Sequence, residues 1–342
     1  MNYQNIAKQL KSTLDTVQRV VVMQADNPDG DSLSSALALE ALLGQMGKDV
    51  VLYCSIDVPN HLRYLEGWDR VQKDFPSQFD LVFVVDCGYW KLFNNFNKNY
   101  GQGRLPKEKL IIINEHKPEQ DMDCAINIQD VNAVSSGHII FELFTAMGQA
   151  IDKTAATFIA SSIMADTLGF TSEVVVDKPR VFEVMADLVR SGLNLGELQD
   201  RRFEQMKISP EMLKYRGELL GRVEYFGDGR IASITIPYDE IRDHSMEFNP
   251  TVILDETRLV TGVAVSIGLK QYMSGGRLVR VTGRIRCNHG FTIADELAKS
   301  FPEGGGHIYA AGFKVEGQDL NFEDIKQKAI ARAIELLDNA KN

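Results

Sequence analysis

The chain has 342 residues, which is long for one compact core and predicts two domains. Its hydrophobic fraction of 44% and charged fraction of 25% are those of an ordinary globular protein, and no run approaches the roughly 18 apolar residues of a membrane span. The formal net charge of −10 disfavours a protein that holds long nucleic acid through its phosphates, because such binding usually needs a basic face. The balance favours short anionic substrates that are bound through a metal.

The cysteines and the N-terminal segment point to a reducing compartment. The four cysteines, at positions 54, 87, 124 and 287, show no paired spacing, so neither a zinc site nor a disulfide framework is indicated. Residues 1–23 predict an amphipathic helix that enters a strand, without the apolar region and cleavage site of a signal peptide. We therefore expect a cytoplasmic protein that makes no use of a membrane.

The first half of the chain alternates short apolar runs with helical patterns. The runs are rich in β-branched residues and nearly continuous, as in strands that are buried on both sides. They lie at residues 20–25, 49–54, 81–88 and 110–116, and the helical patterns lie at 32–47, 135–149, 153–166 and 178–191. The pattern predicts an α/β domain over residues 1–191, with a parallel sheet covered by helices on both faces.

The second half changes character. Residues 192–222 are helical and polar and predict a helical connector. Beyond them, strands joined by Gly-rich turns are expected at 229–237, 261–272, 277–286 and 313–316, with a helix at 292–301, a loop at 302–312 and a terminal helix at 321–339. Residues 223–342 therefore predict a smaller α/β domain with a mixed sheet.

Ionisable residues follow the apolar runs of the first half. Asp29 and Asp31 come after the first run and Asp86 ends the third, while Glu115 and His116 end the fourth. Asp166 closes the apolar helix at 153–166. Because ligands of an open parallel sheet bind beyond the carboxyl ends of its strands, these groups are expected to converge. Solvated aspartates are common at single strand ends, but four such carboxylates together favour a site for Mg²⁺ or Mn²⁺.

Five segments in order resemble the DHH phosphoesterase family. "NPDGDSLSS" (27–35) resembles its first motif and "VVDC" (84–87) its second, while "INEH" (113–116) occupies the place of the DHH triplet. "ADTLGF" (165–170) resembles the fourth motif and "GGGHIYAAG" (304–312) the signature of the DHH-associated C-terminal domain. The family includes RecJ-type exonucleases, nanoRNases, cyclic-dinucleotide phosphodiesterases and exopolyphosphatases. The resemblance implies a hydrolase with two metal ions bridged by Asp86.

The chain departs from the family at the metal ligands. Ala25 stands where the family has a histidine, and the triplet reads Asn-Glu-His. The resemblance implies one ion, Mn²⁺ or Mg²⁺, on four carboxylates: Asp31, Asp86, Glu115 and Asp166. A second, weaker site keeps Asp29 and the shared Asp86, and Gln24, Asp26 or Asn27 are the candidates for its missing ligand. His116 is expected to contact the phosphate or to assist proton transfer, so that His116, Asp86 and Asp29 form the catalytic set.

The C-terminal signature implies a substrate-binding loop. Consecutive glycines let backbone amides approach an anion, and the resemblance assigns substrate contact to Gly304, Gly305, Gly306 and His307. A flexible turn with a core histidine is the other interpretation of such a stretch. Arg284 matches the family's phosphate-binding arginine, and Arg280 and Arg286 alternate with it at a spacing of two.

The functional prediction is a divalent-metal-dependent phosphoesterase. It would hydrolyse phosphodiester or phosphoanhydride bonds in short oligonucleotides, cyclic or linear dinucleotides, or polyphosphate, and long double-stranded nucleic acid is not expected as a partner. The alternative is a degenerate DHH protein that binds a nucleotide or a protein partner without turnover. The pair Ala25 and Glu115 separates the two, because only an enzyme needs a replacement for the lost imidazole. A homodimer is left open.

Overall fold

The structure, a computed structural model, describes residues 1–116, 121–243 and 251–339. It divides into two compact units, Met1–Lys207 and Ile208–Asn342. The division falls inside the range 192–222 that the sequence marks as a connector. Helix α7 (Leu195–Gln205) lies on one side of it and helix α8 (Pro210–Leu220) on the other.

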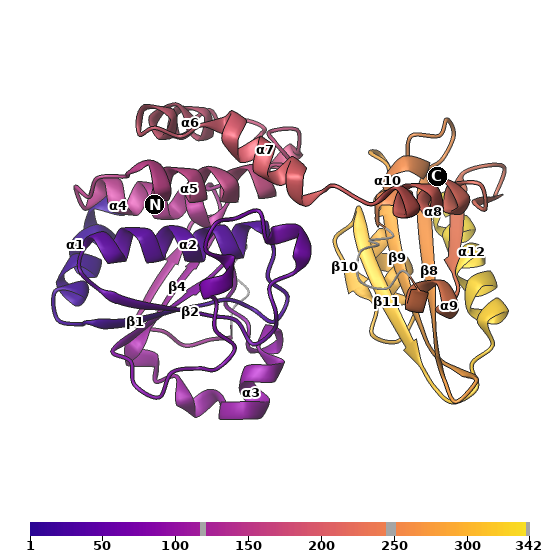
Figure 1. The fold of residues 1–342 in the computed structure, drawn as a ribbon, viewed down its shortest axis with the longest axis horizontal. Coiled ribbons are helices and arrows are strands. Elements are labelled where there is room, and N and C mark those ends of the chain that lie inside the picture. The colour runs from indigo at the N-terminus through magenta and orange to yellow at the C-terminus, as the bar shows by residue number, and fades with distance from the viewer. Residues whose placement is uncertain (117–120, 244–250, 340–342) are drawn as a thin grey trace. The chain divides into compact units, whose positions relative to one another are not determined.

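The first unit is built on a five-stranded sheet whose paired strands all run parallel (Figure 1). The strand order is β2-β1-β3-β4-β5, with bounds β1 Arg19–Met23, β2 Asp49–Tyr53, β3 Leu81–Val85, β4 Leu110–Asn114 and β5 Ile126–Gln129. Strands β3 and β4 are buried at every position, as their continuous apolar runs predict. The α/β class with a parallel sheet is confirmed.

The two faces of this sheet are covered differently. One face packs against α1 (Tyr3–Leu14), α2 (Gly30–Gln45), α4 (Ser136–Ala146) and α5 (Lys153–Asp166), and α6 (Arg180–Arg190) joins the same core. Among the described residues, the other face carries the short helix α3 (Asn94–Tyr100), 3₁₀ turns and loops (Figure 1). Edge-to-face aromatic rings fill this side, including Tyr53, Phe75 and Phe96. Helices therefore cover the first face, whereas the second is covered largely by aromatic side chains from β2, α3 and the irregular segment that holds Phe75.

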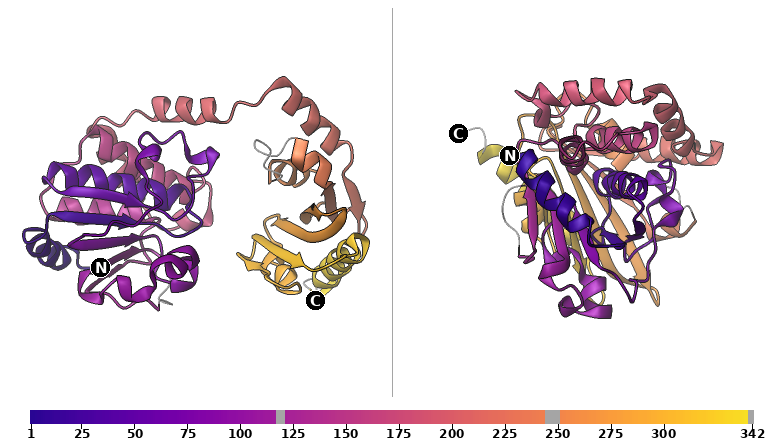
Figure 2. Two further views of the ribbon diagram at one scale, coloured as in Figure 1. Left: turned by 60° about the horizontal axis from the view of Figure 1, so that its bottom comes forward. Right: turned by 90° about the vertical axis from the view of Figure 1, so that its left-hand side faces the viewer.

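The second unit holds a six-stranded mixed sheet, seen from two further sides in Figure 2. Its order is β10-β11-β9-β8-β7-β6, with bounds β6 Glu224–Phe226, β7 Ile231–Ile236, β8 Val265–Ser274, β9 Arg277–Cys287, β10 Gly305–Gly306 and β11 Ala310–Glu316. Only the β7–β8 pair is parallel. Helices α11 (Ala294–Lys299) and α12 (Phe322–Asn339) pack on one face, while α8 and α10 (Thr251–Thr257) cover part of the other, and α9 spans Tyr238–Asp243.

Several expected boundaries in this unit are wrong, and β8 begins at Val265 instead of 261. The last strand begins at Ala310 instead of 313, and Gly305–Gly306 pairs with it as a short strand inside the expected loop. The pairing of Gly305 with Gly312 needs no side chains, so hydropathy could not indicate it. Among the described residues, no helix is both long enough and apolar enough to cross a membrane.

Candidate metal centre

The first acidic residues lie where α2 begins. Asp29 is the N-cap of α2, and its carboxylate accepts a hydrogen bond from the Ser32 amide at 3.0 Å. Gly30 follows because a Cβ there would lie 2.6 Å from the Cβ of Ala165, so only glycine lets α2 approach the end of α5. This close approach brings the start of α2, which carries Asp31, beside the end of α5, which carries Asp166.

Asp31 is fully buried and tightly held. One carboxylate oxygen accepts hydrogen bonds from the hydroxyls of Ser35 (2.8 Å) and Ser162 (2.5 Å), and the other accepts one from the backbone amide of Ser136 (2.8 Å). Burial raises the pKa of Asp31 to about 8, and the nearby Glu115 carboxylate contributes further. A buried carboxylate with this many donors is prepared to carry a negative charge once a cation is present.

Asp86 follows β3 in an unusual backbone conformation. Its φ is +64°, in the left-handed region that aspartate adopts more readily than most residues, and its amide donates to the carbonyl of Ile113 at 2.9 Å. Burial raises the pKa of Asp86 well above its usual range, and the carboxylates of Asp29 and Asp31 raise it further. Such a backbone conformation beside clustered charge is typical of a functional site.

Glu115 lies at the centre of the cluster. Its Oε2 accepts a hydrogen bond from the Ser136 hydroxyl at 2.7 Å, whereas its Oε1 is buried without any hydrogen-bond partner. Two overlapping sets of ligand atoms form around it, each within 4.8 Å: Asp31, Glu115 and Asp166, and Asp86, Glu115 and His116. Burial raises the pKa of Asp166 to about 10, with Asp31 and Glu115 as the next causes.

These residues fit a divalent cation. A buried carboxylate oxygen without a hydrogen bond is costly unless a positive group compensates it, and Glu115 Oε1 has no hydrogen bond, with the His116 imidazole 3.4 Å away. The donor set is mostly carboxylate, which suits hard cations such as Mg²⁺ and Mn²⁺. The convergence expected from the sequence is thus present, although Asp86 joins the set of His116 and not the set of Asp31.

The structure separates the three candidates for the missing ligand of the second site. The Asp26 carboxylate is engaged elsewhere, because it contacts the Ser55 hydroxyl and accepts the Asn95 amide at 2.8 Å. Gln24 is fully buried, and both polar atoms of its side chain lack a hydrogen-bond partner. Asn27 is exposed. Gln24 therefore has an unused amide, whereas Asp26 is already engaged in structural bonds.

Sequence reasoning missed the serines that hold the cluster. Ser35, Ser136 and Ser162 are almost fully buried and contact Asp31 or Glu115. Each is the second residue of a Ser-Ser dipeptide, at 34–35, 135–136 and 161–162. Pairs of serines in otherwise apolar helical segments are the sequence signal that could have identified these residues. The first serine of the middle pair, Ser135, is the N-cap of α4, because its hydroxyl accepts a hydrogen bond from the His138 amide at 3.2 Å.

Two candidate substrate residues of the second unit, Arg284 and Gly305, lie in one row of its sheet. Arg284 on β9 pairs with Gly312 on β11, which in turn pairs with Gly305 on β10, so Arg284 and Gly305 are two strands apart. Arg284 and His307 are exposed.

Backbone geometry also requires glycine at two of the three positions, Gly304 and Gly306. A Cβ on Gly304 would lie 1.8 Å from the carbonyl oxygen of Ala298, and Gly306 has a φ of +154°. The amide of Gly306 donates to the Asp295 carboxylate at 3.0 Å, and the amide of His307 donates to a carbonyl at 2.8 Å. These two amides are not available to a phosphate in this conformation.

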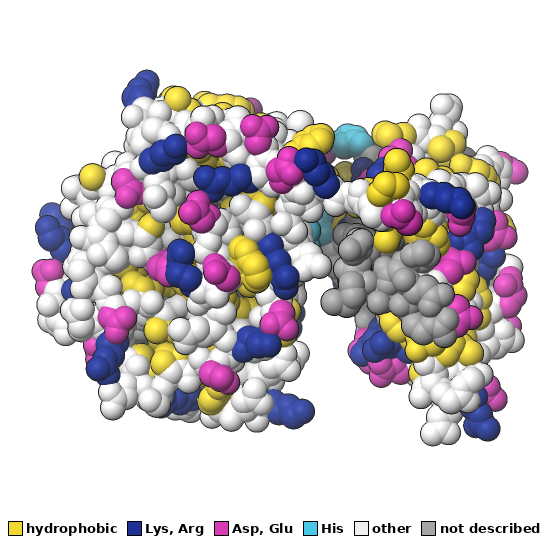
Figure 3. Space-filling model, viewed as in Figure 1, with side chains coloured by type: hydrophobic (Ala, Val, Ile, Leu, Met, Phe, Trp, Pro, Cys, Tyr) yellow, Lys and Arg dark blue, Asp and Glu magenta, His cyan; other side chains and the backbone are white. Residues whose placement is uncertain are grey.

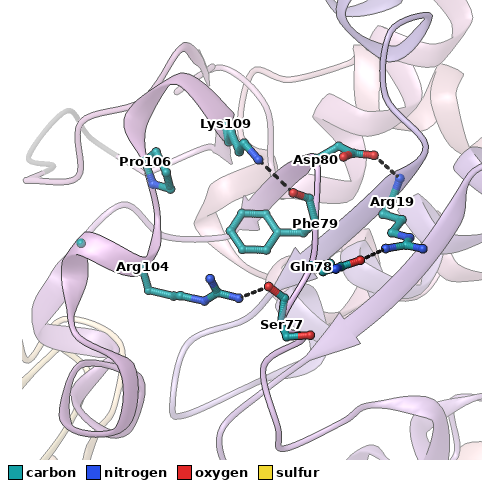
Figure 4. A pocket seen from close by; sticks show the side chains of 9 residues that line it. Arg19, Ser77, Gln78, Phe79, Asp80, Arg104, Pro106 and Lys109 are labelled. Atoms are coloured by element: carbon teal, nitrogen blue, oxygen red, sulfur yellow. Dashed lines mark hydrogen bonds between the residues drawn. The ribbon is translucent and has the colours of Figure 1, made fainter.

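A pocket of about 510 Å³ lies away from the acidic cluster (Figure 4). Arg19 begins β1 and Lys109 directly precedes β4, so the pocket marks the amino ends of the parallel strands, opposite the edge that carries Asp86 and Glu115. The Lys109 ammonium donates to the Phe79 carbonyl at 3.0 Å, and the Arg104 guanidinium donates to the Pro76 carbonyl at 2.8 Å. The lining of this pocket contains none of the expected site residues. On the face in Figure 3, acidic and basic side chains of the first unit are interspersed and form no basic track.

Comparisons with known proteins agree with this geometry. Residues 19–163 match the model of the DHH family, N-terminal domain. The chain is 27% identical over 300 residues to the "Bifunctional oligoribonuclease and PAP phosphatase NrnA" of Thermus thermophilus, covering 86% of this chain and 83% of that protein. It shares its fold with an exopolyphosphatase-related protein from Bacteroides fragilis (TM-score 0.83, 20% identity, 98% of both chains). A weaker likeness is to exonuclease RecJ bound to manganese (TM-score 0.52, 15% identity, 97% of this chain and 94% of that one).

The fold and the acidic cluster thus define a phosphoesterase architecture with a site for divalent metal. Residues 19–163 match the N-terminal domain of the DHH family, and the chain is similar to an NrnA-type oligoribonuclease and phosphatase over most of its length.

Proposed function

We propose that this protein hydrolyses phosphodiester or phosphoanhydride bonds in short nucleotide-type substrates and depends on Mn²⁺ or Mg²⁺. The observation that carries the proposal is the buried carboxylate cluster around Glu115, with its unpartnered Oε1. The similarity to a protein named as an oligoribonuclease and PAP phosphatase favours short oligonucleotides and nucleoside bisphosphates over polyphosphate.

Two groups of residues have different proposed roles, one in binding the cations and the other in binding the substrate. Asp31, Glu115 and Asp166 would hold one divalent ion, and Asp86 would contribute to a neighbouring one, with Asp29 at its edge. A bound ion would supply Lewis acidity to the phosphoryl oxygens and stabilise the charge that develops there. In the second unit, Arg284 and His307 would bind a phosphate or a sugar of the substrate, since both are exposed on the sheet that carries the glycine loop.

The chain's acidity favours short substrates. A net charge of −10 gives little counterion-release energy for a long polyanion, so affinity should come from the metal and from one or two cationic side chains. We therefore expect the rate per molecule to fall as an oligonucleotide lengthens, with dinucleotides to pentanucleotides preferred over strands of tens of nucleotides.

The test is a hydrolysis panel with purified protein. It compares labelled RNA of two to five nucleotides, RNA of about twenty-four nucleotides, adenosine 3′,5′-bisphosphate and polyphosphate, each with Mn²⁺, with Mg²⁺ and with chelator. Asp86→Asn should cost more than the roughly 10- to 100-fold that loss of an outer-shell partner costs. Asp200→Asn, on the exposed surface of α7, is the matched control and should change nothing. Metal binding without turnover of any of these substrates would favour the non-catalytic alternative.

A further inference from the structure

The position of the His116 imidazole is the starting point. Its Nε2 lies 3.0 Å from Asp86 Oδ1 and 3.4 Å from Glu115 Oε1. Neighbouring ligand atoms of an octahedral ion with bonds of about 2.1 Å are about 3.0 Å apart. The two nitrogen–oxygen distances, which also suit a direct ion pair, are therefore compatible with adjacent ligands on one cation, and the ligand atoms of all three residues lie within 4.8 Å of one another.

The second observation is the Glu115 carboxylate itself. Only 8% of Glu115 is exposed, and its Oε1 has no hydrogen-bond partner. The other oxygen, Oε2, is already satisfied by the Ser136 hydroxyl. A cation between Glu115 and His116 would compensate the unpartnered oxygen.

The backbone around His116 is fixed on both sides. Its amide donates to the side-chain oxygen of Asn114 at 3.0 Å, and its carbonyl accepts the Gln129 amide group at 2.8 Å. Asn114 is 1% exposed, so this contact is sheltered from water. Asn114, which replaces the family's leading aspartate in the triplet, thus fixes the backbone amide of His116.

Position 25, where the family has a histidine, has no room for an imidazole. Ala25 is only 7% exposed and packs in an apolar cluster with Met23, Tyr53 and Cys87. A larger side chain there would have to displace these neighbours, which costs stability in a close-packed core.

We infer that His116 supplies the imidazole that Ala25 cannot, so that Asp86, Glu115 and His116 form a second cation site beside the site of Asp31 and Asp166. The inference rests on the proposed function for its cation. It replaces the substrate-contact role expected of His116 from sequence with that of a metal ligand. Because imidazole suits Mn²⁺ better than Mg²⁺, this second site should select Mn²⁺, whereas the all-carboxylate site should not discriminate.

The test is electron spin-echo spectroscopy of the full chain loaded with Mn²⁺. Wild-type protein should show the modulation of a directly bound ¹⁴N, and growth with ¹⁵N-histidine should change it to the ¹⁵N pattern. In His116→Gln the nitrogen modulation should vanish and the affinity of the second ion should fall at least about tenfold.

His61→Gln is the matched control. Burial lowers the pKa of the His61 imidazole and the Asp29 carboxylate raises it, so His61 is a second imidazole close to the cluster. This variant should keep the modulation. A signal that persists in His116→Gln, or that disappears in His61→Gln, overturns the inference.

The wild-type spectrum alone also decides between the two proposals. Bound Mn²⁺ with no nitrogen modulation overturns the role of His116 and leaves the proposed function standing. Failure of the wild type to bind Mn²⁺ at all contradicts the proposed function itself.

Discussion

Ser162→Ala removes a hydroxyl that connects the carboxylate of Asp31, a proposed metal ligand, to the start of α4. Ser162 Oγ donates to Asp31 Oδ1 at 2.5 Å and accepts the Gly137 amide at 2.9 Å. A hydrogen bond to a charged group contributes about 1.5–3 kcal/mol, and each 1.4 kcal/mol is about tenfold in affinity. Asp31 keeps two donors, Ser35 and the Ser136 amide, so the loss should lie at the lower end. We expect the affinity of the Asp31 site for Mn²⁺ to fall about tenfold.

The same change also costs fold stability. The Gly137 amide would lose its acceptor in a buried position, which costs about 1–3 kcal/mol. The two effects are separated by measuring metal affinity by calorimetric titration at pH 7 and the free energy of unfolding in chelator.

Ser161→Ala is the matched control for this measurement. Ser161 is the preceding residue on α5, is 2% exposed, and donates to the Thr157 carbonyl at 2.8 Å, within its own helix. It should leave metal affinity unchanged. Unchanged affinity in Ser162→Ala would refute the assignment of Asp31 as a metal ligand, and equal losses in both variants would show that the effect comes from helix packing.

Three further predictions concern the whole site. At a metal concentration one hundred times its Kd, bound ion should add about 2.7 kcal/mol, or roughly 5 to 10 °C of Tm, in a melting experiment. Asp86→Asn should reduce the shift, because it weakens one of the two ligand sets. Because the pKa is about 8 for Asp31 and about 10 for Asp166, the metal-free protein holds protons there at pH 7, so calorimetry in buffers of different ionisation enthalpy should detect proton release on metal binding. For the same reason, the free energy of unfolding of the metal-free protein should fall as pH rises from about 4 towards about 8, since the folded state keeps a proton that the unfolded state loses. A free energy of unfolding that does not change over this range would contradict the raised pKa values. Arg284→Ala should raise KM without altering metal affinity, while Arg277→Ala, an exposed control at the far end of β9, should change neither.

The sheet and the acidic edge could be predicted because their signals are local. Continuous β-branched runs indicate buried parallel strands, and a carboxylate at the end of such a run must lie at the carboxyl edge of the sheet. Strand β5 was missed because it has only four residues and every second one faces outwards or is half-buried. The aromatic face was missed because Phe75 comes from an irregular segment and Phe96 from the short helix α3, neither of which is long enough to show a period.

The details of the site depend on contacts between distant residues. Ser162 and Asp31 are 131 positions apart, and nothing in the local pattern of α5 indicates that its serine donates to that carboxylate. Likewise, Gly306 reads as an anion-binding glycine in sequence, whereas its amide donates to Asp295, eleven residues away on another element. Both Gln24 and Asp26 carry side-chain oxygens that could bind a metal. Choosing between them required their hydrogen-bond partners, which only the structure gives.

The central claim is that the carboxylates around Glu115 hold divalent metal. X-ray anomalous difference density at the manganese edge, from crystals soaked in Mn²⁺, tests it most directly. The account predicts a peak within about 2.5 Å of the carboxylate oxygens of Glu115 and Asp31, and a second between Asp86 and His116. Strong peaks elsewhere with none at Glu115 would contradict it.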